Sequence, residues 1–532
     1  MTVSEHIIDF LKNKGIKTVF AYPGANVLRL YGQLCKSGIR VILTRHEQGA
    51  IHAAAGYAKA TGKTGVCIAT SGPGAANLVT GIADANLDSA PVLVITGQVP
   101  SRYIGRDAFQ EADIMGITIP VTKHNYLVTE ADEVPRDLEE AFRIANSGRH
   151  GPVLVDITSD LFDTELSESA FDFECLLPRK RNNPYPLSES LEKLFKVISS
   201  SFRPLVLAGG GVVSAGASDS LRTFCRRSGI PCVVTMMGKA LDGSDFDSLL
   251  GMAGRHGTKS ANEALSQCDL LIAVGCRFSD RTVSDFEDFS RSRTIVHCDI
   301  DSAELNKNLK VYLPICADAE EFLSALITLA DRLSPSHVRR YSSWYSNSKY
   351  IVPTPCDFVY RALEKYENTH SKTCIVTDVG TIQTDAARLI TVKRERSYIT
   401  SGGLGAMGFG LPAAIGASFA LSDFENAGED DRVLLIAGDG GFQMTLQELG
   451  ILALCPVPVK IVIINNRTLG MVRDMECGKG GLYALGDYPD FSLIARAYGV
   501  QGSRIPLNAD TEGAVYSFLE GEESGLLEII TN

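Results

Sequence analysis

The chain has 532 residues, of which 45% are hydrophobic, so it is long enough for about three domains with buried cores. Its 51 Lys and Arg against 63 Asp and Glu give a net charge of -12, and no run of basic residues could track a phosphate backbone or an anionic membrane. A nucleic-acid partner is therefore not expected, because binding to a phosphate backbone relies on clustered positive charge.

The first residues, "MTVSEHIIDFLKNKG", lack the features of a signal peptide, and no stretch of about 18 apolar residues runs without a charge. We therefore expect a cytoplasmic protein with no membrane partner. The 13 cysteines include no Cys-x-x-Cys pair. This favours reduced thiols packed as small core side chains over disulfide bonds or a zinc site.

Short β-branched runs alternate with longer amphipathic stretches along the whole chain. Examples in chain order are "TGVCIAT", "APVLVITG", "PLVLAGGG", "DLLIAVG", "RVLLIAGDGG" and "VKIVIINN". Continuous apolar strands with helices between them predict an α/β fold of three doubly wound parallel-sheet domains. Polar, proline-bearing linkers near 177–191 and 333–355 place these domains at residues 1–170, 187–335 and 356–532.

The stretch "ILTRHEQGAIHAAAGYAKATG", residues 42–62, puts Glu47 where an apolar strand meets a helix rich in Ala and Gly. Such small neighbours pack closely and cannot solvate a carboxylate. Taken alone, the stretch also permits an ordinary interpretation, in which Glu47 caps the helix or pairs with Arg45 and His46.

In the last third, "RVLLIAGDGGFQMTLQELG" ends a strand at Asp439 and begins a helix, and "KIVIINN" ends a second strand at Asn466, 27 residues later. Ligands of open parallel sheets bind beyond the carboxyl ends of the strands. Glycines let a diphosphate approach the backbone, and the start of a helix offers free N–H groups. A carboxylate and an amide oxygen are suitable ligands for Mg²⁺.

At these positions the sequence resembles the thiamine diphosphate (ThDP) enzymes, whose signature is a Gly-Asp-Gly turn followed on a second strand by Asn-Asn. The resemblance implies that Asp439, Asn466 and the backbone carbonyl of Thr468 bind Mg²⁺. It assigns the diphosphate contacts to Gly438, Gly440 and Gly441. It also places Met407, in "TSGGLGAMGFGLPAAIGA", beneath the cofactor as the side chain that bends its two rings into a V.

The same resemblance extends to residues 42–62, where Glu47 matches the glutamate that activates the cofactor at N1′ of its aminopyrimidine ring. In this family the pyrimidine and diphosphate sites belong to different domains and face each other across a subunit interface. The resemblance therefore implies a homodimer or a homotetramer.

The resemblance covers essentially the whole chain and is strongest to the acetolactate (acetohydroxyacid) synthase catalytic subunits, in stretches such as "CIATSGPGAANLVTGIADA", "VLVITGQVP" and "DAFQE". Phe109 and Gln110 match family residues beside the thiazolium. The stretches "RHGTKSANEALSQCDLLIAVGCRFSDR" and "HCDIDSAELNKN" resemble the FAD-binding segments of these synthases. Flavin or pocket contacts are thus implied for Arg149, His256, Arg277, Asp299 and Asp301.

Several positions near the reacting carbonyls depart from the synthase pattern. A Gly, a Lys, a Met and a Trp of the family are replaced, in this order, by Ala25, Ser159, Arg255 and Met475. The diphosphate segment usually read as Gly-Gln-His-Gln is "GTIQ", which leaves Thr381 and Gln383 as the cofactor-binding candidates. The first four changes point to the specificity for the second substrate.

We expect a carboligase that decarboxylates a 2-oxo acid such as pyruvate and joins the two-carbon unit to a second 2-oxo acid. The products would be acetolactate or acetohydroxybutyrate, precursors of branched-chain amino acids, and a regulatory small subunit is a candidate partner. An alternative is a pyruvate-donor carboligase with a different acceptor, because Arg255 offers a fixed cation for an acidic carbonyl compound. A flavin-linked pyruvate oxidase and a non-catalytic partner subunit are further alternatives.

Overall fold

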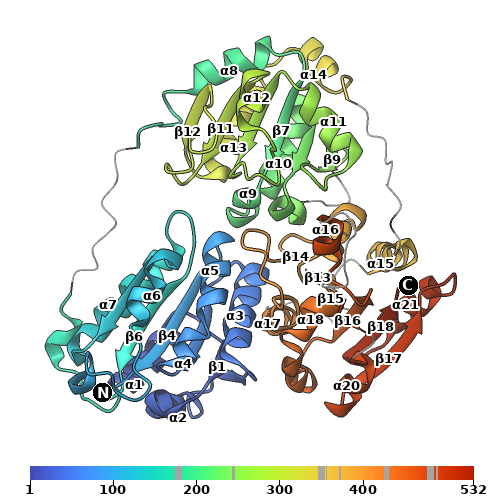
Figure 1. Cartoon of the computed structure of the whole chain (residues 1–532). Coiled ribbons are helices and arrows are strands. Elements are labelled where there is room, and N and C mark those ends of the chain that lie inside the picture. Colours follow the sequence, from blue (N-terminus) through green and yellow to red (C-terminus); the bar gives the residue numbers. More distant parts are fainter. Residues whose placement is uncertain are drawn as a thin grey trace. The chain divides into compact units, whose positions relative to one another are not determined.

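We describe the protein from a computed structural model, whose helices and strands are labelled in Figure 1. It describes residues 1–173, 183–241, 246–345, 354, 356–370, 373–423, 431–475, 484–486 and 489–531. This part of the chain contains three six-stranded sheets with helices between successive strands, and the strand pairings given below are parallel. The predicted α/β class with three parallel sheets is therefore confirmed.

The first sheet has the strand order β2-β1-β3-β4-β6-β5. Its strands are β1 (Thr18–Tyr22), β2 (Arg40–Leu43), β3 (Gly65–Ala69), β4 (Val92–Gln98), β5 (His124–Val128) and β6 (Val153–Thr158). Its helices are α1 (Val3–Asn13), α2 (Leu28–Leu34), α3 (Glu47–Thr61), α4 (Pro73–Ala76), α5 (Val79–Leu87), α6 (Ile114–Thr118) and α7 (Val134–Asn146). Strands β3, β4 and β6 are buried along their whole length, as expected for a sheet covered on both faces.

The second sheet has the order β12-β11-β10-β7-β8-β9. Its strands are β7 (Pro204–Ala208), β8 (Cys232–Val234), β9 (Leu249–Met252), β10 (Leu270–Val274), β11 (Thr294–Asp299) and β12 (Leu313–Cys316). The helices between and after these strands are α8 (Leu191–Ser200), α9 (Gly210–Ser214), α10 (Ser218–Ser228), α11 (Lys259–Gln267), α12 (Phe286–Arg291), α13 (Ala319–Ala330) and α14 (Pro335–Tyr341), and α15 (Asp357–Thr369) comes next in the chain. In this sheet β10 lies between β7 and β11, so the carboxyl ends of these three parallel strands lie side by side.

The third sheet, β14-β13-β15-β16-β18-β17, repeats the strand order of the first. Its strands are β13 (Thr373–Thr377), β14 (Tyr398–Ile399), β15 (Arg432–Gly438), β16 (Val459–Asn465), β17 (Gln501–Pro506) and β18 (Gly525–Ile530). Its helical segments are α16 (Thr381–Leu389), α17 (Gly410–Asp423), α18 (Asp439–Gln443), the 3-10 helix η7 (Leu446–Leu454), α19 (Gly470–Met475), α20 (Phe491–Ala497) and α21 (Thr511–Glu520). Helix α3 follows β2 and α17 follows β14, so these two helices occupy equivalent places in the two sheets.

The described chain forms two compact units. The first unit comprises Met1–Arg179, Thr373–Gln383 and Ile399–Asn532 and holds the first and third sheets, while the second comprises Lys180–Lys372 and Thr384–Tyr398. One hydrophobic core runs from the first sheet through α3 and α17 into the third sheet. The domain limits at 1–170, 187–335 and 356–532 stay predictions.

Helices α3 and α17 pack against each other at very short range, and Figure 1 shows them side by side. A Cβ atom on Gly56 of α3 would collide with the carbonyl of Ala413, and one on Gly416 of α17 would collide with the carbonyl of Ala53. Glycine is needed at both positions because the two backbones touch. The Ala- and Gly-rich stretch noted in the sequence therefore serves this helix contact.

Two expectations from composition concern the whole molecule. In the part of the chain that the structure describes, no helix is long and apolar enough to cross a membrane. The cysteines resolved there as unbonded thiols include the core residues Cys67, Cys225 and Cys374.

Candidate active site

Two neighbouring strands of the third sheet bring the predicted metal ligands together. Asp439 is the first residue of α18, directly after β15, and Asn466 directly follows β16. The two strands pair in parallel up to the register Gly438–Ile464, so their carboxyl ends lie at one edge. Thr468 lies in the loop after Asn466, and the Asn466 Oδ1 atom accepts a hydrogen bond from the Thr468 N–H at 3.1 Å.

The Asp439 carboxylate is buried, at 5% exposure, and its Oδ2 atom has no hydrogen-bond partner among the described residues. Burial raises the pKa of Asp439 to about 6, although the backbone N–H groups of Arg467 and Thr468 act in the opposite direction. A buried, unpartnered carboxylate oxygen is costly unless a cation occupies the position that it faces. The side chain therefore fits a metal ligand.

The chemistry of the remaining donors fits Mg²⁺ better than a transition metal. No group of three or more His, Cys, Asp and Glu side chains that could hold a metal ion occurs within the described ranges. The loop instead offers a carboxylate, an amide oxygen and backbone carbonyls. Mg²⁺ prefers such oxygen donors and keeps part of its coordination shell for water and phosphate.

The glycine turn at residues 438–441 lies next to this loop, and protein atoms closely surround two of its three glycines. A Cβ on Gly440 would lie 2.6 Å from Leu469 Cδ2 and 3.5 Å from Met407 Cε, whereas one on Gly438 would meet nothing within 4 Å. A Cβ on Gly441 would lie 2.5 Å from Asp378 Oδ1. Met407 Cε therefore lies next to the glycine turn, and its place beneath a cofactor stays a prediction.

Thr381 and Gln383 lie on α16 in different surroundings. A Cβ on Gly470 would lie 2.9 Å from Asn466 Nδ2 and 3.9 Å from Thr381 Cγ2. Thr381 therefore borders the loop of residues 466–468, which carries the predicted metal ligands Asn466 and Thr468 and is called the metal loop below. Gln383 is buried, and its amide nitrogen donates to Thr400 Oγ1 at 2.6 Å and to the Ser401 carbonyl at 2.9 Å. The Gln383 amide thus holds the segment that leads to Met407.

Two residues that the sequence analysis did not single out shape the metal loop. Asn465 Nδ2 donates to Glu528 Oε1 at 2.7 Å, and Asn465 Oδ1 accepts from the Arg467 N–H at 3.0 Å. Glu528 is fully buried and also accepts from the N–H groups of Phe491 and Ser492. The first Asn of "INN" was a visible signal for this role, but nothing in the sequence pointed to Glu528.

Glu47 lies at the equivalent edge of the first sheet, after β2, as the first residue of α3. It is 7% exposed, and its Oε2 atom accepts a hydrogen bond from Asn77 Nδ2 at 3.0 Å. The helix cap is His46, whose Nδ1 accepts from the Gln48 N–H at 3.0 Å, while Arg45 donates to the carbonyls of Leu43 and Gly450. Glu47 therefore neither caps the helix nor pairs with Arg45 or His46 through these contacts.

The predicted residue Gln110 lies next to the turn of Gly72 and Gly74, which borders Glu47. A Cβ on Gly74 would lie 3.1 Å from Glu47 Oε1, and one on Gly72 would lie 2.6 Å from the Gln110 carbonyl. Gln110 adopts a φ of 62°. Phe109 is 88% exposed, an unusual state for an aromatic side chain at a predicted site.

Ala25 and Ser159 lie at the same edge of the first sheet. Asn26, the neighbour of Ala25, donates to Ser71 Oγ at 2.6 Å, close to the Gly72 turn. The Ser159 N–H donates to the Gln98 carbonyl at 3.0 Å, beyond the ends of β4 and β6. Their role in substrate specificity stays a prediction.

Glu448, on η7, links the first and third sheets, and the sequence analysis did not single it out. Its carboxylate accepts the Arg45 N–H at 3.0 and 3.1 Å, next to the start of α3. Glu448 is fully buried, and this burial raises its pKa to about 7. It therefore anchors the turn that leads to Glu47.

Four of the predicted flavin contacts lie in the second unit, and the fifth, Arg149, lies in the first and donates to Ser89 Oγ at 2.9 Å. Arg277 follows β10, and Asp299 and Asp301 lie at and beyond the end of β11. Asp299 Oδ1 accepts the Asp301 N–H at 2.9 Å. These three side chains thus follow adjacent strands, as expected for a nucleotide site.

Arg255 and His256 lie after β9 in the same unit. Arg255 is exposed, and its N–H donates to the Arg281 carbonyl at 2.9 Å. Burial, followed by the positive charges of Arg255, Arg281 and Arg388, lowers the pKa of His256. Met475 is the last residue of α19, and its side chain lies outside the described part.

A buried carboxylate and an amide at adjacent strand ends, above a glycine turn, are typical of enzymes that bind a diphosphate cofactor through a metal ion. Family models of the thiamine pyrophosphate enzymes match the chain in three segments. The N-terminal TPP binding domain matches residues 1–117, the central domain residues 191–326 and the C-terminal TPP binding domain residues 378–529.

Among known proteins, the chain is 41% identical to the probable acetolactate synthase large subunit of Methanocaldococcus jannaschii, over 100% of this chain and 92% of that protein. It is 40% identical to the acetolactate synthase isozyme 2 large subunit of Escherichia coli, over 99% and 95% of the two chains. It is 42% identical to the acetolactate synthase large subunit of Corynebacterium glutamicum, over 95% and 82%. The chain therefore belongs to the thiamine pyrophosphate enzymes, in the family of the acetolactate synthase large subunits.

Proposed function

We propose that the protein is a ThDP- and Mg²⁺-dependent carboligase of the acetolactate synthase type. Pyruvate is the donor, and its decarboxylated two-carbon unit is joined to a second 2-oxo acid to give acetolactate or acetohydroxybutyrate. The observation that carries this proposal is the buried Asp439 carboxylate, whose Oδ2 has no partner among the described residues, beside the loop of Asn466 and Thr468.

Asp439, Asn466 and the carbonyl of Thr468 would hold Mg²⁺, and the turn of Gly438, Gly440 and Gly441 would admit the diphosphate. When bound, ThDP supplies a nucleophilic carbon that can accept the electrons released by decarboxylation. Met407 supports the cofactor by its contact with the glycine turn, at 3.5 Å from the Cβ position of Gly440. Thr381 and Gln383 complete this side through their positions on α16.

Glu47 would hold a proton at N1′ of the aminopyrimidine ring. The hydrogen bond from Asn77 leaves the Glu47 Oε1 atom directed toward Gly74, and the absence of a side chain there keeps space beside the carboxylate. Phe109 and Gln110 would cover the reacting carbonyl from the segment next to Gly72. Burial of Glu47 limits competition from water.

The two half-sites support a homodimer, of which a homotetramer would be a further assembly. Lys59, in the last turn of α3, donates to the Thr400 carbonyl in the segment leading to Met407. Glu47 lies twelve residues earlier in α3, a separation of about 18 Å along the helix axis. In enzymes of the type that the chain resembles, the two half-sites face each other across a subunit interface, so we propose that Glu47 serves the cofactor held by a second copy. Because the relatives are named large subunits, a regulatory small subunit is a further proposed partner.

We also propose that the second unit binds FAD through His256, Arg277, Asp299 and Asp301, while Arg149 stays a candidate that the resemblance implies. The support is a glycine crossing, in which a Cβ on Gly211 would lie 2.6 Å from the Cα of Gly275. Dinucleotide-binding units use a glycine for such close packing of a helix against a strand, and the acidic side chains on the adjacent strand can accept hydrogen bonds from ribose.

The test is the Glu47→Gln variant assayed for CO₂ release and acetolactate formation from pyruvate with ThDP and Mg²⁺. We expect turnover to fall by about 10²- to 10⁴-fold, the usual contribution of a positioned acid–base group. The control Glu139→Gln removes a partly buried glutamate that pairs with Lys14 at 2.7 Å, and it should keep the parent rate. Turnover within about twofold of the parent in Glu47→Gln would disprove the proton role.

A second candidate function keeps pyruvate as donor but uses an acidic acceptor carbonyl. It is favoured by the exposed guanidinium of Arg255 beside the positive charges that lower the pKa of His256. Product analysis with pyruvate and a panel of second carbonyl compounds tests it, with Arg255→Met as the matched variant. Loss of only the acidic acceptors in the variant would support this function, and an unchanged product pattern would remove it. Reduction of bound flavin by pyruvate at the turnover rate would indicate an oxidase instead.

A further inference from the structure

The segment Thr400–Gly408, which carries Met407, is held firmly at its far end by groups of the third sheet. The fully buried carboxylate of Asp378 accepts the N–H groups of Gly408 and Gly410, each at 3.0 Å. Thr445 Oγ1 donates to the Gly408 carbonyl at 2.8 Å. This end of the segment is therefore fixed by the domain that holds the diphosphate.

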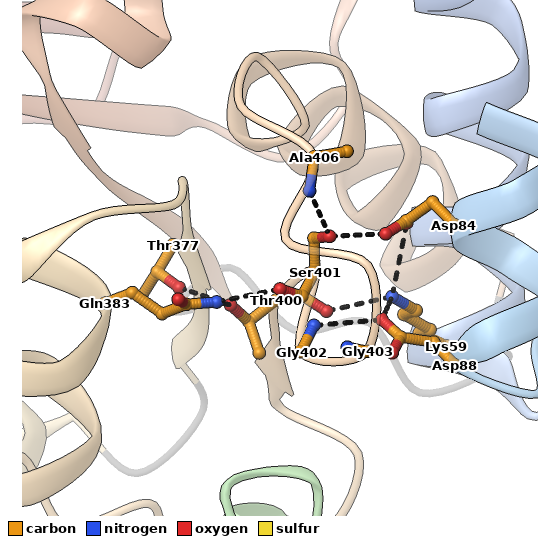
Figure 2. A network of polar contacts seen from close by, with 10 residues as sticks. All are labelled: Lys59, Asp84, Asp88, Thr377, Gln383, Thr400, Ser401, Gly402, Gly403 and Ala406. Carbon is orange, nitrogen blue, oxygen red and sulfur yellow. Dashed lines mark hydrogen bonds and ion pairs between the residues drawn. The ribbon is translucent and has the colours of Figure 1, made fainter. Parts of the chain in front are cut away.

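The near end is held from the first sheet. Figure 2 shows Lys59 of α3 and Asp88, the residue after α5, facing this part of the segment. Lys59 Nζ donates to the Thr400 carbonyl at 2.8 Å and to Asp88 Oδ2 at 2.6 Å. Asp88 in turn accepts the N–H groups of Gly402 at 3.1 Å and Gly403 at 2.6 Å. Three consecutive peptide groups of the segment are thus bound to one ion pair.

A third side chain of the first sheet, Asp84 of α5, joins the same network through Ser401 (Figure 2). The Ser401 hydroxyl donates to Asp84 Oδ1, and its oxygen accepts the Ala406 N–H at 2.8 Å, so that the segment closes on itself one residue before Met407. Asp84 is fully buried, and its Oδ2 atom lies 3.9 Å from Lys59 Nζ. The Lys59 charge therefore compensates both carboxylates.

We propose that Lys59, Asp84 and Asp88 are positioning residues that set the place of Met407, so that the first sheet of each chain controls the cofactor site of its own third sheet. The inference rests on the proposed function, because Met407 has a role only where ThDP binds. None of the three side chains needs to touch the cofactor. They act through Ser401 and the peptide groups of the segment.

A second carboxylate, Asp423, also joins the first sheet to the third but lies far from Met407 in the sequence. It therefore serves to distinguish a positioning role from a role in holding the sheets together. Asp423, the last residue of α17, accepts hydrogen bonds from Thr18 Oγ1 and Tyr57 Oη, each at 2.9 Å, and pairs with Arg40 at 3.1 Å. Like Asp88, it joins the first sheet to the third through a well-covered carboxylate. It makes these contacts 16 residues beyond Met407, at the far end of α17.

The test compares Asp88→Asn and Ser401→Ala with the control Asp423→Asn. Ser401→Ala removes only the hydroxyl bridge and keeps the ion pair, so it serves if Asp88→Asn folds poorly. Hydrogen exchange of the cofactor-free protein is measured on peptides covering residues 400–408. Calorimetry at saturating Mg²⁺ then gives the dissociation constant of ThDP. We expect faster exchange in these peptides and a dissociation constant raised about tenfold in the first two variants, with both quantities unchanged in the control.

Each other outcome has a defined meaning. A dissociation constant within twofold of the parent in both test variants would overturn the inference, even if exchange became faster. An equal loss in Asp423→Asn would overturn it too, because the network would then only hold the sheets together. A parent protein that binds no ThDP would refute the proposed function and the inference with it, whereas normal binding by the parent confines any failure to the inference.

Discussion

The hydrogen bonds of Asn465 should control the affinity of the metal loop. In Asn465→Ala, the Arg467 N–H loses its acceptor and Glu528 loses a donor at 2.7 Å. Arg467 has a φ of 58°, a conformation that a non-glycine residue adopts at a cost. Without the Asn465 side chain, the loop is free to leave the geometry that aligns Asn466 and the Thr468 carbonyl.

The magnitude follows from the two bonds that are lost. A hydrogen bond to a charged group contributes about 1.5 to 3 kcal/mol and a neutral one about 1 kcal/mol, so together they are worth about 3 kcal/mol. If half of this free energy holds the loop in its metal-binding form, the Mg²⁺ affinity falls about tenfold, since about 1.4 kcal/mol corresponds to a factor of ten. Losses of this size are common for residues that orient metal ligands.

The assay is a Mg²⁺ titration of ThDP binding by calorimetry, combined with denaturant unfolding. The matched control is Asn125→Ala, which removes a buried amide that donates to the Met115 carbonyl at 2.8 Å and to Thr118 Oγ1 at 2.9 Å, far from the metal loop in sequence. Both variants should lose about 2 to 3 kcal/mol of unfolding free energy. Only Asn465→Ala should need about tenfold more Mg²⁺, with full binding recovered at high concentration.

An unchanged Mg²⁺ requirement in Asn465→Ala, together with the expected loss of stability, would refute this reasoning. The loop would then be held by its backbone bonds, in which the Thr531 N–H donates to the Asn465 carbonyl at 2.9 Å and the Leu485 N–H to the Arg467 carbonyl at 2.7 Å.

Two more predictions concern Asp156 and Gly440, both in the first unit. Burial raises the pKa of Asp156 to about 7, so the folded chain keeps this proton to a higher pH than the unfolded chain, and the unfolding free energy should fall as pH rises from about 4 to about 7. Asp156→Asn should flatten that decline in denaturant titrations at a series of pH values, and an unchanged slope would contradict the assignment. In Gly440→Ala the new Cβ would lie 2.6 Å from Leu469 Cδ2, so the Leu469 side chain must shift toward its neighbours and ThDP binding measured by calorimetry should weaken by up to about tenfold. Gly513→Ala, whose Cβ would meet nothing within 4 Å, should bind as the parent does, and equal binding by both variants would count against a tight turn.

The features that the sequence revealed are local. The run "VKIVIINN" predicted a strand ending near Asn466, and β16 ends at Asn465. A strand, its end and the polar residue that follows are written in consecutive letters, so apolar runs and glycines suffice to find them. For the same reason Asp439 and Glu47 could be placed at sheet edges from sequence alone.

The features that the sequence did not reveal depend on contacts between distant segments. Asp84 and Ser401 are 317 residues apart, and no local pattern indicates that a carboxylate on α5 meets a loop before α17. Gln383 was predicted as a cofactor contact, yet its amide nitrogen is directed to Thr400 and Ser401, which are 17 and 18 residues further along the chain. The exposure of Phe109 likewise depends on its surroundings rather than on the letters around it.

The glycine contact between α3 and α17 has a consequence for how substrates reach the site. Because the two backbones touch at Gly56 and Gly416, the distance between the first and third sheets cannot be adjusted by turning side chains. Opening by separation of these helices would expose a large apolar core, so entry must depend on the loops at the sheet edges. Attempts to widen the enzyme for bulkier acceptors should therefore alter the exposed segment around Phe109 and leave the helix pair untouched.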